Sequence, residues 1–390
     1  MPEPLLEILF VSHKFPPAIG GMEKQSYELI TGMERYAKVH RLVYDGSGSI
    51  IRFFYCLKKN IIRICKENPR ISVIHFNDGL ITAFCARHKG YEHLKRTATL
   101  HGLDVVFPSN IYHCHILPRF NNFDKLIAVS QATAESAISL GIHPNKLTVI
   151  HNGVDVKDFR DQNSVNIQNT LAKFGIDYQN QPILVAMGRP VRRKGFSWFI
   201  KSVVPLLKGE FLFLLIGPYH SKPTAAERFL FFLPKNLKEK LTLFLGFPSD
   251  TPALRTLLVD PEFSKSVKHL GRLHDAEVKT IFAAASGFVM PNIQVDGDME
   301  GFGLVCLEAV IAGVPVFAAD IDGIPDAIRD GKNGYLLPSG DPEAWAQRLN
   351  VLLANPKSEK LNVAAFRAYT IENYNWEKMT KAYYELFKSL

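Results

Sequence analysis

The sequence predicts an α/β protein of two domains, each built around a parallel β-sheet. Its 390 residues are more than one hydrophobic core usually organises, and they suit two domains. Short apolar runs alternate with helix-like segments in both halves, as repeated βαβ units require. The turn signal Asn152-Gly153 separates the halves. We therefore expect a first domain over residues 1–155 and a second over residues 156–374.

Composition places the chain among folded proteins. It is 47% hydrophobic and 22% charged, which is ordinary for a globular protein. No apolar run reaches the length of about 18 residues that crosses a bilayer, so we expect no membrane-spanning helix. The apolar run that follows Leu5 is too short for a signal peptide. These features predict a cytoplasmic protein.

The cysteines and the net charge limit the kinds of site and partner that the protein can have. Five cysteines are scattered without the close pairs typical of zinc sites: Cys56, Cys65, Cys85, Cys114 and Cys306. They are predicted to be buried thiols in a reducing compartment. The formal net charge of +8 indicates an anionic partner. Nucleic acid, an anionic membrane face and phosphorylated small molecules all fit this charge.

Apolar runs bounded by turn residues predict the strands. In the first half these are Leu5–Ser12, Val73–Phe76, Thr97–Leu100, Leu126–Val129 and Leu147–Ile150. In the second half they are Ile183–Met187, Phe211–Ile216, Val267–Leu270 and Ala283–Met290, with one more after Pro315. Helical periodicity predicts helices from Gly21 to Met33 and over Ile50–Lys66, Phe196–Leu207, Asp275–Ala285, Leu304–Ala312 and Asn375–Leu390.

Two turns that follow strands are suited to bind phosphate. Gly20 and Gly21 come after the first strand and open a helix, where adjacent backbone N–H groups can form an anion nest. The other turn lies between Gly188 and Gly195 and carries four cations: Arg189, Arg192, Arg193 and Lys194. Arginine binds phosphate through two parallel hydrogen bonds, and lysine adds a mobile point charge.

A third site is predicted where a strand ending at Met290 leads through a polar loop into a helix. Glu300 stands just before this helix and Glu308 lies eight positions later, so both can lie on roughly the same side. In open α/β sheets, ligands bind at the carboxyl ends of the strands. Carboxylates there suit the hydroxyl groups of a sugar or a ribose.

The segment Glu300-Gly301-Phe302-Gly303-Leu304, with Glu308-Ala309 and Gly313-Val314-Pro315-Val316 after it, resembles the signature of glycosyltransferase family 4. Further matches to that family are the Gly-Arg-x4-Lys-Gly turn at 188–195, the His-x-x-Asp element at 101–104 and the Asn-Gly-Val-Asp element at 152–155. The resemblance spans nearly the full chain. It implies the GT-B fold, in which two Rossmann-like domains face each other across a cleft.

The resemblance also implies residue roles. The catalytic set is His101, Arg189, Lys194 and Glu300. Donor contacts are implied for Gly21, Gly271, Arg272, Leu273, Gly301, Phe302, Gly303, Leu304 and Glu308. Acceptor contacts are implied for Glu23 and Asp104. The donor is a nucleoside diphosphate sugar, with UDP favoured over GDP, and no cofactor, metal or nucleic acid takes part. The acceptor is a glycan or a lipid-linked or small molecule, and the terminal helix 375–390 packs on the first domain.

Several alternatives stay open at this point. A nucleotide-sugar 2-epimerase has the same architecture, and a sugar-nucleotide-binding protein without activity would carry the same fold. Asp296-Gly297-Asp298 is similar to the metal motif of another transferase fold, but GT-B enzymes do not generally need a metal. The helix Ile50–Lys66 is either a core helix with a basic edge or an interfacial helix on anionic lipid. The long insertion at 219–266 either packs on its domain or forms a docking surface.

Overall fold

The computed structural model describes residues 5–156, 167–223, 249–356 and 360–390. Contacts along the chain divide it into two compact units. Unit 1 comprises Met1–Asp155, Met299–Leu304 and Asn373–Leu390, and unit 2 comprises Val156–Asp298 and Val305–Glu372. The segment Met299–Leu304 therefore packs with unit 1, although the sequence places it inside the second domain.

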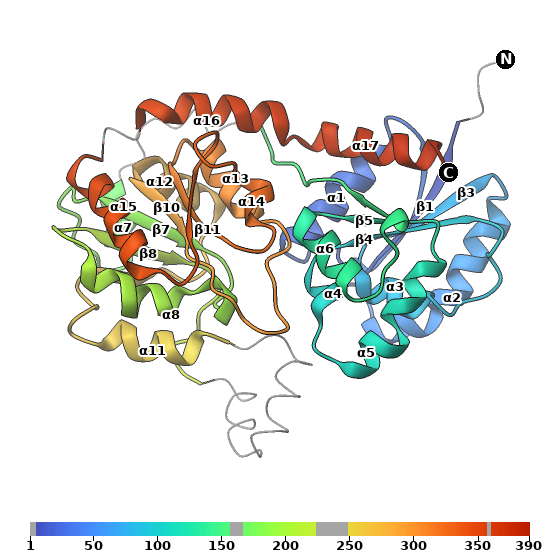
Figure 1. The fold of residues 1–390 in the computed structure, drawn as a ribbon, viewed down its shortest axis with the longest axis horizontal. Coiled ribbons are helices and arrows are strands. Elements are labelled where there is room, and N and C mark those ends of the chain that lie inside the picture. Colours follow the sequence, from blue (N-terminus) through green and yellow to red (C-terminus); the bar gives the residue numbers. More distant parts are fainter. Residues whose placement is uncertain (1–4, 157–166, 224–248, 357–359) are drawn as a thin grey trace. The chain divides into compact units, whose positions relative to one another are not determined.

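Unit 1 is a six-stranded parallel sheet in the order β2-β1-β3-β4-β5-β6, with helices on both faces (Figure 1). Its strands are β1 Glu7–Ser12, β2 Lys38–Val43, β3 Ile71–Phe76, β4 Lys95–Leu100, β5 Lys125–Ala128 and β6 Leu147–Val149. Its α-helices are α1 Gly21–Met33, α2 Ile50–Glu67, α3 Gly79–Cys85, α4 Leu103–Val106, α5 Asn110–His115, α6 Gln131–Ser139 and α17 Trp376–Lys388. Short 3₁₀ turns cover Leu117–Asn122 and Pro144–Lys146.

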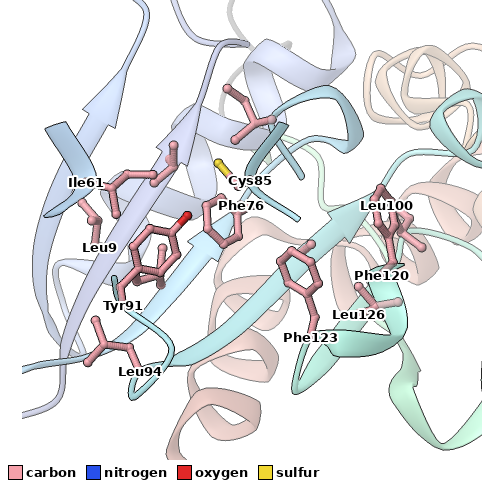
Figure 2. Packing of buried hydrophobic residues seen from close by; sticks show 14 of the residues in the cluster. Leu9, Ile61, Phe76, Cys85, Tyr91, Leu94, Leu100, Phe120, Phe123 and Leu126 are labelled. Carbon is pink, nitrogen blue, oxygen red and sulfur yellow. The ribbon is translucent and has the colours of Figure 1, made fainter. Parts of the chain in front are cut away.

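Alternate side chains of β1 point to opposite faces of this sheet and meet different helices. Ile8 and Phe10 belong to the core under α1 and α17. Leu9 and Val11 belong to the larger core on the other face, which also contains Ile61 of α2. In that core Phe76 and Phe123 meet edge to face with ring centroids 5.6 Å apart (Figure 2). Both faces are thus closed, as a parallel sheet requires.

The terminal helix α17 completes the first of these two cores. Asn375 caps it, because its side-chain oxygen accepts a hydrogen bond from the backbone N–H of Lys378 at 2.7 Å. Trp376, Met379, Tyr383 and Phe387 are buried against the sheet and α1. The amphipathic pattern of 375–390 thus matches a helix that packs on unit 1.

Unit 2 is a second six-stranded parallel sheet, in the order β12-β11-β10-β7-β8-β9 (Figure 1). Its strands are β7 Ile183–Met187, β8 Leu212–Ile216, β9 Val267–His269, β10 Gly287–Met290, β11 Val316–Asp320 and β12 Tyr335–Pro338. Its α-helices are α7 Ile167–Ala172, α8 Phe196–Trp198, α11 Thr251–Val259, α12 Asp275–Ala284, α13 Leu304–Ile311, α14 Ile324–Ala327, α15 Pro342–Ala354 and α16 Lys360–Asn373. The fold class predicted from the sequence, α/β with two Rossmann-like domains, is confirmed.

Several details differ from the prediction. The strand expected over Ala283–Met290 begins only at Gly287, because α12 continues through Ala284. The helix expected over Phe196–Leu207 is broken into an α-turn, a π-turn over Phe199–Val203 and a 3₁₀ turn over Val204–Leu206. Pro205, which has no backbone N–H, falls in the last of these. Cys85 and Cys306 are buried, but Cys56 and Cys65 are half-buried and Cys114 is exposed, so the expectation of five buried thiols was wrong for these three.

Candidate active site

Three neighbouring strands of unit 1 end in polar residues at the same edge of the sheet. His13 follows β1, Asn77 and Asp78 follow β3, and His101 follows β4. Because β3 lies between β1 and β4, its loop contacts both histidines. Parallel strands direct their carboxyl ends to one edge, and ligands bind there in open α/β sheets.

His101 is held in one orientation. Its Nε2 lies 2.9 Å from the carbonyl oxygen of Asn77. A carbonyl oxygen only accepts, so Nε2 must carry a proton and the neutral ring keeps its lone pair on Nδ1. The backbone N–H of His101 donates to the Asp104 carboxylate, at 2.8 and 3.1 Å to its two oxygens. Burial raises the pKa of Asp104, and His101 opposes this rise. Asp104 thus anchors the loop that presents His101.

The loop Met299–Leu304 lies directly on this histidine loop within unit 1. A side chain at Gly301 would collide with the carbonyl oxygen of His101, and one at Gly102 would press on Gly301 and Met299. Leu304 in turn lies close to Gly21 at the start of α1. The structure therefore gathers three of the sequence motifs at one place: the glycine turn before α1, the loop after β4 and the Glu-Gly-Phe-Gly loop, with Glu300 half-buried beside it.

The side chain of Phe302 packs against two other rings in unit 1. It is buried and its ring centroid lies 5.7 Å from that of His151 and 6.2 Å from that of Tyr374. A contact between this residue and a donor would therefore come from its backbone.

The start of α1 is already occupied by a carboxylate. Glu23 lies in the first turn of α1, with its side chain against Gly20 and 3.6 Å from Lys14. An anion bound at Gly20 and Gly21 would meet this negative charge, whereas a sugar hydroxyl would find an acceptor. The geometry therefore favours Glu23 as a hydroxyl contact more than the glycines as a phosphate nest.

A buried hydrogen-bond network lies beneath these loops. His75 contacts the hydroxyls of Thr97 at 2.8 Å and Thr99 at 3.0 Å, and the Asn77 side chain at 3.1 Å. Thr99 in turn lies 2.9 Å from the hydroxyl of Tyr383 on α17. Burial lowers the pKa of His75 to about 3, so its ring is neutral. The network fixes the β3 loop through neutral donors and acceptors.

In unit 2 the strand ends are built from glycines and cations. Gly188 follows β7, and its backbone N–H donates to Ile216 of β8 at 2.9 Å. The buried side chain of Lys194 runs beside Gly188, with Cε 3.4 Å from the position of a Cβ there. Arg189 is exposed, and its guanidinium makes no ion pair within the described ranges. These two cations therefore present charge at the end of β7.

Arg193 has a different role from the one that the basic turn suggested. It is buried and donates from one nitrogen to both carboxylate oxygens of Asp298, each at 3.1 Å. The backbone N–H of Ile293 also donates to the carbonyl oxygen of Arg193. The turn is thus tied to the loop after β10. The expectation of four phosphate-binding cations is corrected to a smaller set, and Asp298 is engaged in an ion pair.

The turn after β9 was predicted to hold the nucleotide base. The N–H of Gly271 donates to Nδ1 of His269 at 3.0 Å, and its carbonyl oxygen accepts from Gly217 at 2.9 Å. Burial lowers the pKa of His269 to about 4, which keeps its ring neutral as an acceptor. Arg272 is exposed and Leu273 half-buried. These two residues extend from a rigid turn, and Glu308 lies half-buried in the second turn of α13.

Sequence reasoning missed His13 and Asp78. Nδ1 of His13 lies 2.8 Å from a carboxylate oxygen of Asp78, which is buried. The available signal was position alone: His13 follows the first strand directly, just as His101 follows the fourth. Asp78 carries no sequence signal beyond its place after β3.

The two six-stranded parallel sheets with flanking helices are those of the GT-B fold. The chain belongs to glycosyltransferase family 4. One family model, described as Glycosyltransferase Family 4, matches residues 19–158, and another, Glycosyl transferases group 1, matches residues 181–355.

Proteins with similar sequences include a glycosyltransferase and a synthase of a sugar phosphate. The chain is 26% identical over 286 residues to alpha-maltose-1-phosphate synthase of Mycolicibacterium smegmatis, covering 68% of this chain and 63% of that protein. It is 26% identical over 276 residues to D-inositol 3-phosphate glycosyltransferase of Corynebacterium urealyticum, covering 69% and 58%. The chain thus spans less than two thirds of the length of these relatives.

A solved structure shows the same fold. Alr3699/HepE of Anabaena, in complex with UDP, matches with a TM-score of 0.73 at 18% identity, covering 99% of this chain and 100% of that one. The same protein has been solved with UDP-glucose.

Proposed function

We propose that the protein is a retaining glycosyltransferase, which moves a sugar from a nucleoside diphosphate sugar to a hydroxyl of a glycan, lipid-linked or small-molecule acceptor. The observation that carries the proposal is the turn after β7, where buried Lys194 and exposed Arg189 lie between Gly188 and Gly195. These two positive charges would stabilise the nucleoside diphosphate as it leaves, because negative charge builds up on it in the transition state.

The other residues have roles that follow from their chemistry. Glu308 accepts hydrogen bonds from ribose hydroxyls and Glu300 from the donor sugar. His101 faces the transferred sugar, while Glu23 and Asp104 belong to the acceptor side. Arg272 and Leu273 support the base. In this scheme residues 156–374 hold the donor and residues 1–155 the acceptor. Polysaccharide or glycolipid synthesis in the cytoplasm is the setting that uses such a reaction.

UDP is our first choice of nucleotide, supported by the UDP and UDP-glucose complexes of the Anabaena protein. A thermal-shift screen with UDP-, GDP- and ADP-sugars tests this choice. A ligand at about 100 times its dissociation constant adds about 2.7 kcal/mol to the free energy of unfolding, so the matching donor raises Tm by several degrees. A chain whose Tm no nucleotide sugar changes would contradict the proposal.

Turnover then separates the rival functions. A transferase releases the nucleoside diphosphate and gives a product whose anomeric configuration, read by NMR, equals that of the donor. A 2-epimerase converts the donor without any acceptor, and a binding protein shows a thermal shift without turnover.

We also propose peripheral contact with an anionic membrane face through α2. Two of its apolar side chains, Ile51 and Tyr55, are 78% and 88% exposed. Exposed cations flank them: Arg52, Lys58, Lys59, Arg63 and Lys66. Each cation near an anionic leaflet contributes on the order of 1 kcal/mol, and inserted apolar side chains add to this. No helix among the described residues is long and apolar enough to span a membrane.

Co-sedimentation with phosphatidylglycerol and phosphatidylcholine vesicles tests this contact. We expect pelleting with anionic vesicles at low salt, its loss at high salt, and weaker pelleting of the double variant Ile51→Ser/Tyr55→Ser. The exposed Val259 and Val351 of unit 2 provide a matched control pair of Ser substitutions. Equal pelleting with neutral vesicles would contradict an electrostatic contact. The insertion around Arg228–Leu233 lies outside the described residues.

A further inference from the structure

A pocket of about 510 Å³ lies at the amino-terminal edge of the sheet in unit 1. It is formed by the loop between α3 and β4, by Arg96 near the start of β4 and by Asn122 before β5. His101 follows the other end of β4, and the five residues that separate it from Arg96 extend about 17 Å along a strand. The pocket is therefore separate from the candidate active site.

The loop that forms one wall of the pocket is fixed by packing and by hydrogen bonds. Tyr91 and Leu94 are buried in the core of unit 1 (Figure 2). The hydroxyl of Tyr91 lies 3.1 Å from Nδ1 of His88, and the backbone N–H of Gly90 donates to the carboxylate of Glu92 at 2.7 Å. A wall that is already ordered loses little conformational entropy when a ligand binds.

The charges that line the pocket favour an anion. Three cations line it: Arg87, Lys89 and Arg96. None of the three forms an ion pair within the described ranges. Backbone N–H groups, and then the charges of Arg96 and Lys89, lower the pKa of Glu92, which also lines the pocket. With Glu92 ionised, the described lining keeps a surplus of two positive charges, which attracts an anion.

The guanidinium of Arg96 keeps hydrogen-bond donors that the protein does not use. Its Nη2 donates to the carbonyl oxygen of Asn122 at 2.9 Å, and its carbon Cζ lies 5.4 Å from the centroid of the Phe123 ring. Its Nε is a buried atom that makes no hydrogen bond among the described residues. A buried donor without an acceptor is costly, and an oxygen atom of an anion at this edge of the guanidinium would remove the cost. Two N–H groups on one edge of a guanidinium match two oxygens of a phosphate.

The basic side of α2 borders the pocket. A side chain at Gly90 would press on Ile62 of α2, so the loop lies against this helix. Burial, and then the positive charge of Lys58 on α2, lowers the pKa of His88. Lys58 is exposed. The pocket thus continues the cationic surface of α2 toward the edge of the sheet.

We propose that this pocket is a binding site for a phosphate group, carried by a free phosphate ester or by the headgroup of an anionic lipid. Arg96 binds the phosphate through the edge of its guanidinium, and Arg87 and Lys89 add charge at the mouth of the pocket. The inference does not depend on the proposed glycosyl transfer, because the pocket lies at the opposite edge of the sheet from His101.

The first experiment uses inorganic phosphate as the probe, at constant pH and ionic strength. The readout is the ring C–H signals of His88 in NMR spectra, identified by their absence from His88→Gln. We expect these signals to shift saturably in wild type, and the affinity for phosphate to fall about tenfold in Arg87→Gln/Lys89→Gln. Both side chains are exposed, so Tm should be unchanged. Signals that do not move, or that give the same affinity in wild type and in this variant, would overturn the site.

Lys378→Gln/Lys381→Gln is the matched control. Both lysines are exposed on α17, which packs on the other face of the sheet from the core that contains Tyr91. The control removes the same two charges from the same unit, and its affinity for phosphate should equal that of wild type. A loss as large as that in the pocket variant would show that only net charge matters, and the site would be excluded.

Vesicles separate the two sources of the phosphate group. If a lipid headgroup binds, Arg87→Gln/Lys89→Gln should weaken pelleting with phosphatidylglycerol vesicles more than the Lys378/Lys381 control does, and inorganic phosphate should compete. If a free phosphate ester binds, the two double variants should pellet equally while the response of His88 to phosphate persists. Either result supports the site and names its ligand, provided that the pocket variant has lost affinity for phosphate.

Discussion

The two sheets place their polar groups at equivalent edges but hold them by different means. In unit 1 the groups after β1, β3 and β4 are oriented by hydrogen bonds between side chains, as in the His13–Asp78 pair. In unit 2 the groups after β7, β8 and β9 depend on glycine backbones that approach one another closely, such as Gly188 and Gly217. Side-chain networks orient protons and hydroxyls, whereas open backbone leaves room for a phosphate.

The largest expected effect lies at the cations of unit 2. Lys194→Ala and Arg189→Ala should each lower turnover about 100-fold, because one lost electrostatic contact in the transition state costs roughly 3 kcal/mol. Far-ultraviolet circular dichroism and Tm should stay near those of wild type. Arg192→Ala is a control, since Arg192 is exposed on the same turn. Full turnover in both Ala variants would end the assignment of a phosphate site.

The next largest expected effect is on the free energy of unfolding, at a glycine whose backbone conformation and surroundings exclude a side chain. Gly195 has φ of 65°, and a side chain there would collide with the carbonyl oxygen of Pro291. We expect Gly195→Ala to lower the free energy of unfolding by about 3 kcal/mol. Gly209 has φ of 83° with open space around it, so Gly209→Ala should cost only about 1 kcal/mol. Equal losses in urea denaturation would show that the close approach to Pro291 contributes nothing.

The buried hydrogen-bond network around His75 in unit 1 should make the free energy of unfolding depend on pH. His75 has a pKa of about 3 in the folded protein because it is buried, against about 6.5 when unfolded. The unfolded state therefore binds more protons below pH 6.5, and stability is lost as pH falls from there toward 3, by about 1.4 kcal/mol per pH unit. His75→Gln should remove this share of the slope. A slope unchanged in that variant would place the pH dependence elsewhere.

The smallest expected effect concerns chelation. Activity should survive EDTA unchanged, because Arg189 and Lys194 supply the positive charge and Asp298 is engaged with Arg193. The alternative metal site at Asp296 and Asp298 requires the opposite result. Activity that EDTA abolishes and Mn²⁺ or Mg²⁺ restores would favour that site.

All strands inside the two sheets were predicted from the sequence, whereas of the four edge strands β6 and β9 were predicted and β2 and β12 were not. β7 and β8 are uninterrupted apolar runs because helices cover both of their faces. β2, with the sequence KVHRLV, lies at an edge and none of its residues is fully buried, so no apolar run marks it. β12 is an edge strand of only four residues. A strand could therefore be recognised in the sequence where it carried an apolar run, and β2 carried none.

The residues of the candidate site, too, were only partly predictable from the sequence. Turns that need glycine, such as Gly188 and Gly195, can be recognised in the sequence because few other residues adopt their conformation. Arg193 could not be told from its neighbours, since its burial against Asp298 depends on a loop about a hundred residues away. Asp78 likewise becomes informative only when β3 is seen beside β1. Pairings between distant segments are set by topology, and composition does not record them.

Unit 1 is built from segments that lie far apart in the sequence. This affects the order in which the nascent chain can fold. α17 covers Leu29, Ile30 and Met33 of α1 and gives Tyr383 to the buried network, while Val154 forms a β-bridge with Asn375. On the ribosome, the sheet encoded first cannot close its second face until the segment 373–390 has been synthesised, after all of unit 2. Unit 1 is therefore the last to finish folding, although its synthesis starts first, and its exposed apolar face is the part of the nascent chain that a chaperone would need to shield.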